Sequence, residues 1–278
     1  MAFKLFPIGA FFGKVLRRFV AEKFDQISAS LAFTTLLSLV PLVAIILGVI
    51  SLLPVFPGIV DQFDHFLVRD LLPERSAGMI IKYLLEFSQK AAHVTLVGLA
   101  GLLITVLFLL VSIERAFNHV WRVEGSRPWW KRMRLYAVVL VLWPLVVSGV
   151  VLAIYYAVTS SLGLVNDPEW LHSVMFKVAG LLVAAIFFAG FYYAVPNARV
   201  APRDALWAGV FAANGFMLMQ KGFEYYLWYF PSLTFVYGAF ATVPIFLLWL
   251  YLSWAVVLLG ALVAALLPEF SERPDPGG

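Results

Sequence analysis

Long stretches without a charged residue are the feature that most constrains this chain. No Asp, Glu, Lys or Arg occurs between Asp25 and Asp61, or between Lys90 and Glu114. The hydrocarbon core of a bilayer is about 30 Å thick and is crossed by about 20 apolar residues as a helix, and a charge within it is costly. Only 13% of the residues are charged, about half the share of a soluble domain. The intervals therefore predict membrane-spanning helices.

Six such intervals predict an all-α fold, a polytopic membrane helical bundle with six transmembrane helices. In chain order the predicted spans are 29–53, 90–114, 134–159, 177–199, 204–221 and 241–267. We expect a single membrane domain over 1–278, with an N-terminal segment 1–28, a bundle 29–267, an external loop 54–91 and a tail 268–278.

Lysine and arginine in the loops predict the orientation. Fourteen of them precede the first span, follow the second, fourth or sixth, and six lie in the opposite loops. Because basic residues are retained on the cytoplasmic side, both termini are expected in the cytoplasm of a bacterial inner membrane. The net charge of +4 is thereby explained by topology, and no nucleic-acid partner is expected.

Three segments are expected outside the membrane core. Residues 12–27 form an amphipathic pattern with a basic face, typical of a helix on anionic lipid, or of an anchor that only fixes topology. The loop 54–91 predicts two amphipathic helices. The aromatic segment 223–240, interrupted by Pro231 and Gly238, predicts an interfacial or partly re-entrant turn, with a seventh span as the alternative.

Several ordered sequence blocks carry a resemblance to a known family. They are SLAFTTLLSLVP (30–41), SIERAFNHVWR (112–122), VPNARV (195–200), FPS through YG (230–238), VPIFLLWLY (243–251) and LLGA (258–261). In these blocks the chain resembles the YihY/BrkB family of bacterial inner-membrane proteins, once called ribonuclease BN-like. The resemblance covers nearly the whole chain and implies six spans, a poorly defined activity and a suspected role in transport across the envelope. Where that family often has a glutamate after Gly260 and Ala261, this chain has Leu262.

The residues that a hydrolytic enzyme requires are not assembled in the sequence. Its four histidines are His65, His93, His119 and His172, and none has metal-ligand spacing to another His or Cys. The sequence has no phosphate-binding glycine loop and no nucleophile elbow. We therefore expect no enzymatic activity, no metal and no cofactor.

Polar residues within the spans are the candidates for function, because burying them is costly unless they are paired. Ser30, Thr34 and Ser38 recur every four residues before Pro41, where a kink is expected, and Asn214 lies midway along the fifth span. They predict a polar path between the first, fourth and fifth spans. The alternative is helix packing, which the small residues Ala205, Gly209 and Ala213 also favour on the fifth span.

Charged residues at the span ends form a second group of candidates. They are Glu114 at a cytoplasmic end and Lys177 and Glu224 at external ends, where the last two are placed to form an ion pair. Snorkelling of either side chain to water is the alternative.

Two functions fit these features. The first is a transporter or flippase for an amphiphilic, lipid-related envelope component. The second is a membrane scaffold that recruits envelope partners and would have a fully packed bundle. Membrane lipids are the expected partners, envelope proteins are possible partners, and the sequence does not indicate an oligomeric state.

Overall fold

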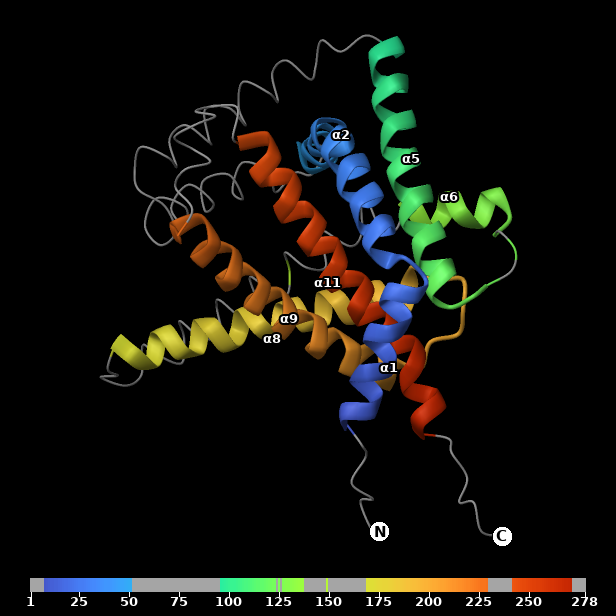
Figure 1. The fold of residues 1–278 in the computed structure, drawn as a ribbon. Helices are drawn as coiled ribbons and strands as arrows, with labels where there is room; N and C mark the ends of the chain where they lie inside the picture. Colours follow the sequence, from blue (N-terminus) through green and yellow to red (C-terminus); the bar gives the residue numbers. More distant parts are fainter. Residues whose placement is uncertain are drawn as a thin grey trace. The chain divides into compact units, whose positions relative to one another are not determined.

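All regular structure in the described part of the chain is helical. The computed structural model describes residues 8–51, 96–123, 125, 127–137, 149, 169–229 and 242–271. Its helices are α1 (Ile8–Ala21), α2 (Phe24–Ser51), α5 (Leu96–Val120), α6 (Trp129–Ala137), α8 (Glu169–Ala194), α9 (Pro202–Tyr229) and α11 (Thr242–Ser271) (Figure 1). The predicted all-α class is confirmed for these residues. The loop 54–91 with its two predicted helices lies outside them, and so does the predicted third span, apart from residues 134–137 in α6 and residue 149.

The chain divides into two compact units. One unit contains residues 1–36 and 111–278, and the other contains residues 37–110. In the smaller unit, the hydroxyl of Ser38 on α2 donates to the carbonyl of Thr105 on α5 at 3.2 Å. Val106 and Leu109 are buried beside this contact on α5.

Two described helices have the length and composition to cross a membrane. Their apolar segments are Leu103–Val120 in α5 and Val243–Glu269 in α11, and α8 has a shorter apolar segment, Val178–Ala194. Both long segments fall on predicted spans. Among the described residues the count of six spans is thus supported only in part.

In the larger unit, α8 and α9 pack along each other and α11 packs on α9. Gly209 on α9 lies where the α8 backbone approaches most closely. A Cβ at this position would be 2.7 Å from the backbone nitrogen of Ala189 and even closer to the carbonyl oxygen of Ala185. The neighbouring Ala205 and Ala213 are buried, so the small-residue face predicted on this helix does pack closely.

A second close contact joins α8 to α11. The hydroxyl of Tyr192, which is fully buried, donates to the carbonyl of Val257 at 3.0 Å. The same hydroxyl and Ala212 of α9 occupy the space that a Cβ on Gly260 would need. Leu262, which stands where the family often has a glutamate, is completely buried. An apolar residue there satisfies the packing without a polar partner.

The predicted helix over 12–27 is wrong in one respect, because the chain breaks within it. α1 ends at Ala21 and α2 begins at Phe24, and Lys23 between them has a left-handed backbone with φ of 55°. The break allows both Val15 of α1 and Phe24 of α2 to be buried. Val15 and Phe24 are nine residues apart, so one straight helix would point them to opposite sides.

Two helices extend beyond the predicted span ends. α9 continues to Tyr229, so residues 223–229 are helical and not part of a turn, and residues 230–240 lie outside the description. α11 continues through Pro268 to Ser271, so the predicted tail begins as helix. No proline lies between Lys221 and Tyr229, and Gly222 alone does not interrupt the backbone hydrogen bonds of α9.

Candidate functional site

Glu114, one of the predicted charged sites, is buried on α5, where the charge-free part of that helix ends. Only 1% of it is exposed. Its Oε2 accepts a hydrogen bond of 2.6 Å from the hydroxyl of Tyr136 and lies 2.8 Å from Nε of Arg132, both on α6. Because Tyr136 and Arg132 are four residues apart, they share one face of this helix. The three side chains therefore fasten α6 to α5.

This cluster is not fully satisfied. Within the described residues, Oε1 of Glu114 has no hydrogen-bond partner, and Nε of Arg132 lacks the geometry of a hydrogen bond despite its short distance to the carboxylate. A buried polar atom without a partner costs about 1–3 kcal/mol. Such a cost in a well-packed region marks the cluster as a functional candidate.

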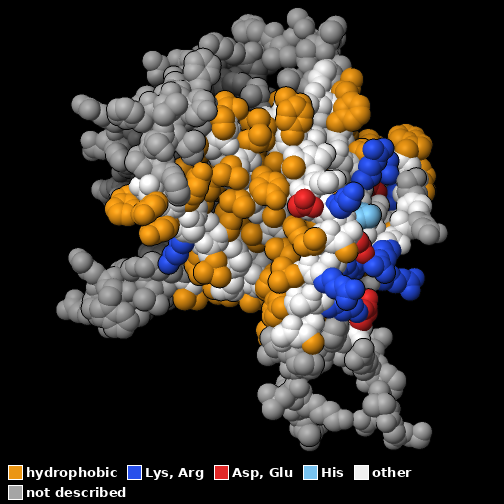
Figure 2. Space-filling model, in the orientation of Figure 1, with side chains coloured by type: hydrophobic (Ala, Val, Ile, Leu, Met, Phe, Trp, Pro, Cys, Tyr) orange, Lys and Arg blue, Asp and Glu red, His pale blue; other side chains and the backbone are white. Residues whose placement is uncertain are grey.

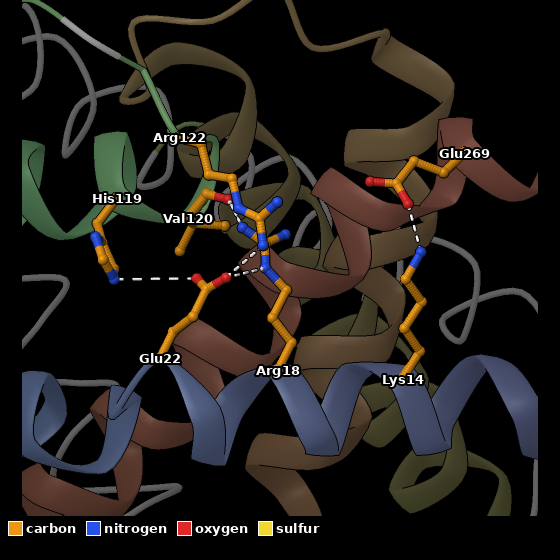
Figure 3. Close-up of polar contacts among 7 residues, drawn as sticks. All are labelled: Lys14, Arg18, Glu22, His119, Val120, Arg122 and Glu269. Carbon is orange, nitrogen blue, oxygen red and sulfur yellow. Dashed lines mark hydrogen bonds and ion pairs between the residues drawn. The ribbon is translucent and has the colours of Figure 1, made fainter.

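Glu22 is the centre of a second polar cluster, at the break between α1 and α2 (Figure 3). Its Oε1 accepts hydrogen bonds from Nε of Arg18 at 2.9 Å and from a terminal nitrogen of Arg122 at 2.6 Å. Nε2 of His119 lies 4.0 Å from the other oxygen. Burial raises the pKa of Glu22, but the hydrogen bonds from the two arginines outweigh it and hold that pKa below its usual value.

Arg18 and Lys14 extend this contact from α1 to two other helices. Arg18 also donates to the carbonyl of Val120, the last residue of α5, at 2.6 Å, which satisfies an end carbonyl that the helix leaves free. Lys14 pairs with Glu269 of α11 at 2.5 Å (Figure 3). α1 is thus held by ion pairs and hydrogen bonds to residues far along the chain.

A third cluster joins two of the sequence blocks that carry the family resemblance. The side-chain oxygen of Asn118 accepts the backbone N–H of Asn197 at 2.9 Å. Arg127 donates to the side-chain oxygen of Asn197 and to the carbonyls of Val195 and Pro196, at 2.6 to 3.2 Å. The turn that follows α8 is therefore fixed to the segment after α5.

We call these three clusters together the basic end. Its members are Lys14, Arg18, Glu22, Glu114, Asn118, His119, Arg122, Arg127, Arg132, Tyr136, Asn197 and Glu269. On the visible face, lysine and arginine side chains gather around α1 and α6, and hydrophobic side chains cover the area over α9 and α11 (Figure 2). This division is typical of a helical protein with its apolar part in lipid and its polar end in water.

The residues predicted to line a path lie in different environments. On α2, Ser30 is exposed, the hydroxyl of Thr34 donates to the carbonyl of Ser30 in its own helix, and Ser38 and Pro41 are buried. The side-chain amide of Asn214, which is half-buried, donates to the carbonyl of Val210 one turn earlier on α9. Within the described residues, these hydrogen bonds are local ones, apart from that of Ser38.

The other predicted charged pair is described only in part. Glu224 is exposed near the end of α9. Lys177 is on α8, but its side chain lies outside the described residues, and so does the predicted ion pair between them. No group of three potential metal ligands occurs in the part of the chain that the structure describes.

The sequence located Glu114 but not its partners. Arg132 and Tyr136 are four residues apart in a short, basic segment, and this spacing was the only available signal that they share a face. Nothing in a single sequence indicates that this face meets Glu114. The contact between Asn118 and Asn197 was equally hidden, although both residues lie in blocks that the resemblance had singled out.

Comparisons with known proteins agree with these observations. Residues 15–277 match the family model described as Virulence factor BrkB. The chain is 43% identical over 269 residues to a UPF0761 membrane protein of Azoarcus sp. strain BH72, covering 97% of this chain and 66% of that protein. It is 41% identical over 256 residues to a UPF0761 membrane protein of Aromatoleum aromaticum, covering 92% and 63%. The chain thus spans slightly less than two thirds of these relatives, and no solved structure matches it.

Long apolar helices with polar clusters at their ends, and relatives that are named membrane proteins, define this chain as a helical membrane protein. It belongs to the family described as Virulence factor BrkB, and over most of its length it is similar to UPF0761 membrane proteins. The predicted resemblance is confirmed.

Proposed function

We propose that the chain is an inner-membrane protein with six spans and both termini in the cytoplasm. α9 supports a span that hydropathy alone does not select. Trp207 and Trp228 are 59% and 76% exposed near opposite ends of this one helix. The part of α9 between Asp204 and Lys221 carries no charge, so the spanning segment ends at Lys221, and Trp228 lies about two turns beyond it on the same side of the membrane. Tryptophans at both interfaces are typical of a spanning helix.

The topology predicts where reporter enzymes will be active. A reporter that works only in the cytoplasm should be active when fused after Arg122, Arg203 or Glu272, and inactive when fused within 54–91. Fusion activity in whole cells measures this directly, with an export-dependent reporter at the same positions as the control. External activity of the fusion after Glu272 would contradict the count of six.

We further propose that the protein transports or flips an amphiphilic, lipid-related envelope component, without a chemical reaction or cofactor of its own. The observation that supports this is the buried Glu114 cluster. A carboxylate enclosed at the end of a spanning helix is costly, and in membrane proteins such groups mark pathways and coupled movements. Among the described residues, Glu114 contacts α6 through the side chains of Arg132 and Tyr136. A change in the charge of its carboxylate would therefore weaken or strengthen the attachment of α6 to α5.

Lipid flipping in proteoliposomes tests the role of Glu114. The full chain, reconstituted with a fluorescent phospholipid, should speed the exposure of that lipid to an impermeant quencher relative to vesicles without protein. Glu114→Gln keeps the shape but removes the charge, and is expected to lower this rate at least about tenfold, the equivalent of one hydrogen bond to a charged group. Glu269→Gln, which alters an exposed carboxylate of the same basic end, should retain the rate.

Two results would contradict the proposal. A wild-type rate equal to that of empty vesicles would show that the protein does not flip this class of lipid. An unchanged flipping rate for Glu114→Gln would show that the charge of Glu114 has no role in flipping.

The alternative is a membrane scaffold that recruits envelope partners. The close packing at Gly209 and Gly260 favours it, because at these levels α8, α9 and α11 leave no space even for a methyl group. Transport along the α8–α9 interface requires these helices to separate there. Cysteine at Asn214 distinguishes the two functions, since the chain has no native cysteine: an impermeant thiol reagent labels a hydrated path and leaves a packed interface unmodified.

A further inference from the structure

The short helix α6 has two faces of different chemistry. Its inner face carries Arg132 and Tyr136, which contact Glu114. At 100° per residue, Trp130, Lys131 and Arg134 lie on the opposite face. All three are exposed, and Nζ of Lys131 lies 5.3 Å from the centre of the Trp130 ring. Because the ion pair fixes one face of α6 to α5, the opposite face of α6, which is basic and aromatic, points outward.

The position of α6 places this face at the boundary between hydrocarbon and water. Glu114, to which α6 is attached, is the first charged residue of α5 and ends the charge-free part of this helix. Trp129 and Trp130 at the start of α6 are 75% and 54% exposed. Large aromatic side chains exposed at this level are typical of the headgroup region, where the ring is buried among lipids and the ring N–H remains hydrated.

We propose that the outer face of α6 binds the phosphate of anionic phospholipids in the surrounding membrane. Lys131 and Arg134 supply the positive charges, and Trp130 on the same face lies among the adjoining acyl chains. Charge complementarity selects this partner, because the face carries two cations and is attached at the membrane boundary. Lipid binding there holds the segment after α5 against the bilayer, independently of whether the protein transports anything.

Native mass spectrometry of the full chain in detergent tests this inference. Phosphatidylglycerol and phosphatidylcholine are titrated separately, and the dissociation constant of the first bound lipid is measured. K131Q/R134Q should bind phosphatidylglycerol about thirtyfold more weakly than wild type, since each basic residue at an anionic surface is worth about a fivefold change. Its affinity for phosphatidylcholine should be unchanged. K131R/R134K keeps both charges and should bind as the wild type does.

The matched control removes the same charge from two exposed arginines that lie outside α6. R199Q/R203Q should bind phosphatidylglycerol within about threefold of wild type, because these arginines lie in the link between α8 and α9 and at the start of α9, and so are not part of the proposed site on α6. Unchanged binding by K131Q/R134Q, or an equal loss in both double variants, would overturn the assignment to α6. Displacement of the lipid by an equal concentration of soluble glycerol phosphate would also overturn it, because Trp130 would then contribute nothing.

Discussion

Gly209→Ala is expected to weaken the packing of α8 on α9 by about 1–3 kcal/mol, with a matching fall in the thermal unfolding temperature of the purified protein. The added methyl group meets the backbone of Ala185 and Ala189, which cannot turn aside as a flexible side chain would. Either the two helices move apart or both bend. Because this region also joins α11, the loss should lower the amount of folded protein in membranes as well.

Gly222→Ala is the matched control on the same helix. A Cβ at Gly222 meets no atom of the described residues within 4 Å. Replacing a helical glycine in open space leaves stability unchanged or raises it by about 0.5–1 kcal/mol, because alanine restricts the unfolded chain. Equal destabilisation by the two substitutions would show that close packing at Gly209 is not the cause.

Glu114→Ala should be the most damaging single change in the basic end. It leaves the guanidinium of Arg132 and the hydroxyl of Tyr136 without their acceptor in a buried site. Removing one partner of a buried ion pair costs about 3–5 kcal/mol, and we expect the lower value because the side chain of Arg132 is 22% exposed. Unfolding measured in the same detergent as the wild type, by loss of helical signal on heating, gives the difference.

A triple substitution separates lost interactions from lost packing. In Glu114→Leu with Arg132→Leu and Tyr136→Phe, no polar group remains without a partner, and apolar replacements of a buried pair are often neutral. We expect most of the stability to return while the flipping activity stays low. A triple variant as unstable as Glu114→Ala would mean that the polar contacts themselves hold α6 in place.

The sequence predicted the helices better than their ends, and the reason is physical. A charge such as Lys221 or Glu269 indicates where the bilayer ends, because charges are costly in hydrocarbon. A helix ends where its backbone hydrogen bonds are interrupted, and neither residue interrupts them. α9 and α11 therefore continue beyond the charges that were taken as their limits.

The close contact at Gly209 was predictable because small residues four apart on one helix leave a groove for another backbone. The partners of Glu114 were not predictable, because no pattern in a single sequence indicates that Glu114 and Tyr136, which are on different helices, come into contact. The break at Lys23 was missed for a related reason. Lysine has no special preference for a left-handed backbone, and the contact that neighbouring Glu22 makes with Arg122, 100 residues away, leaves no pattern in the sequence.

The ion pair between Lys14 and Glu269 has a consequence for the order in which the protein is made. These residues are 255 positions apart, so the ribosome must synthesise 255 further residues after Lys14 before α1 can reach this partner. Until then, Phe12, Leu16 and Val20, which stay exposed even in the finished structure, can hold α1 at the lipid surface. The contact of α1 with α11 therefore forms only after α11 has been made, whereas its contacts with Val120 and Arg122 can form earlier.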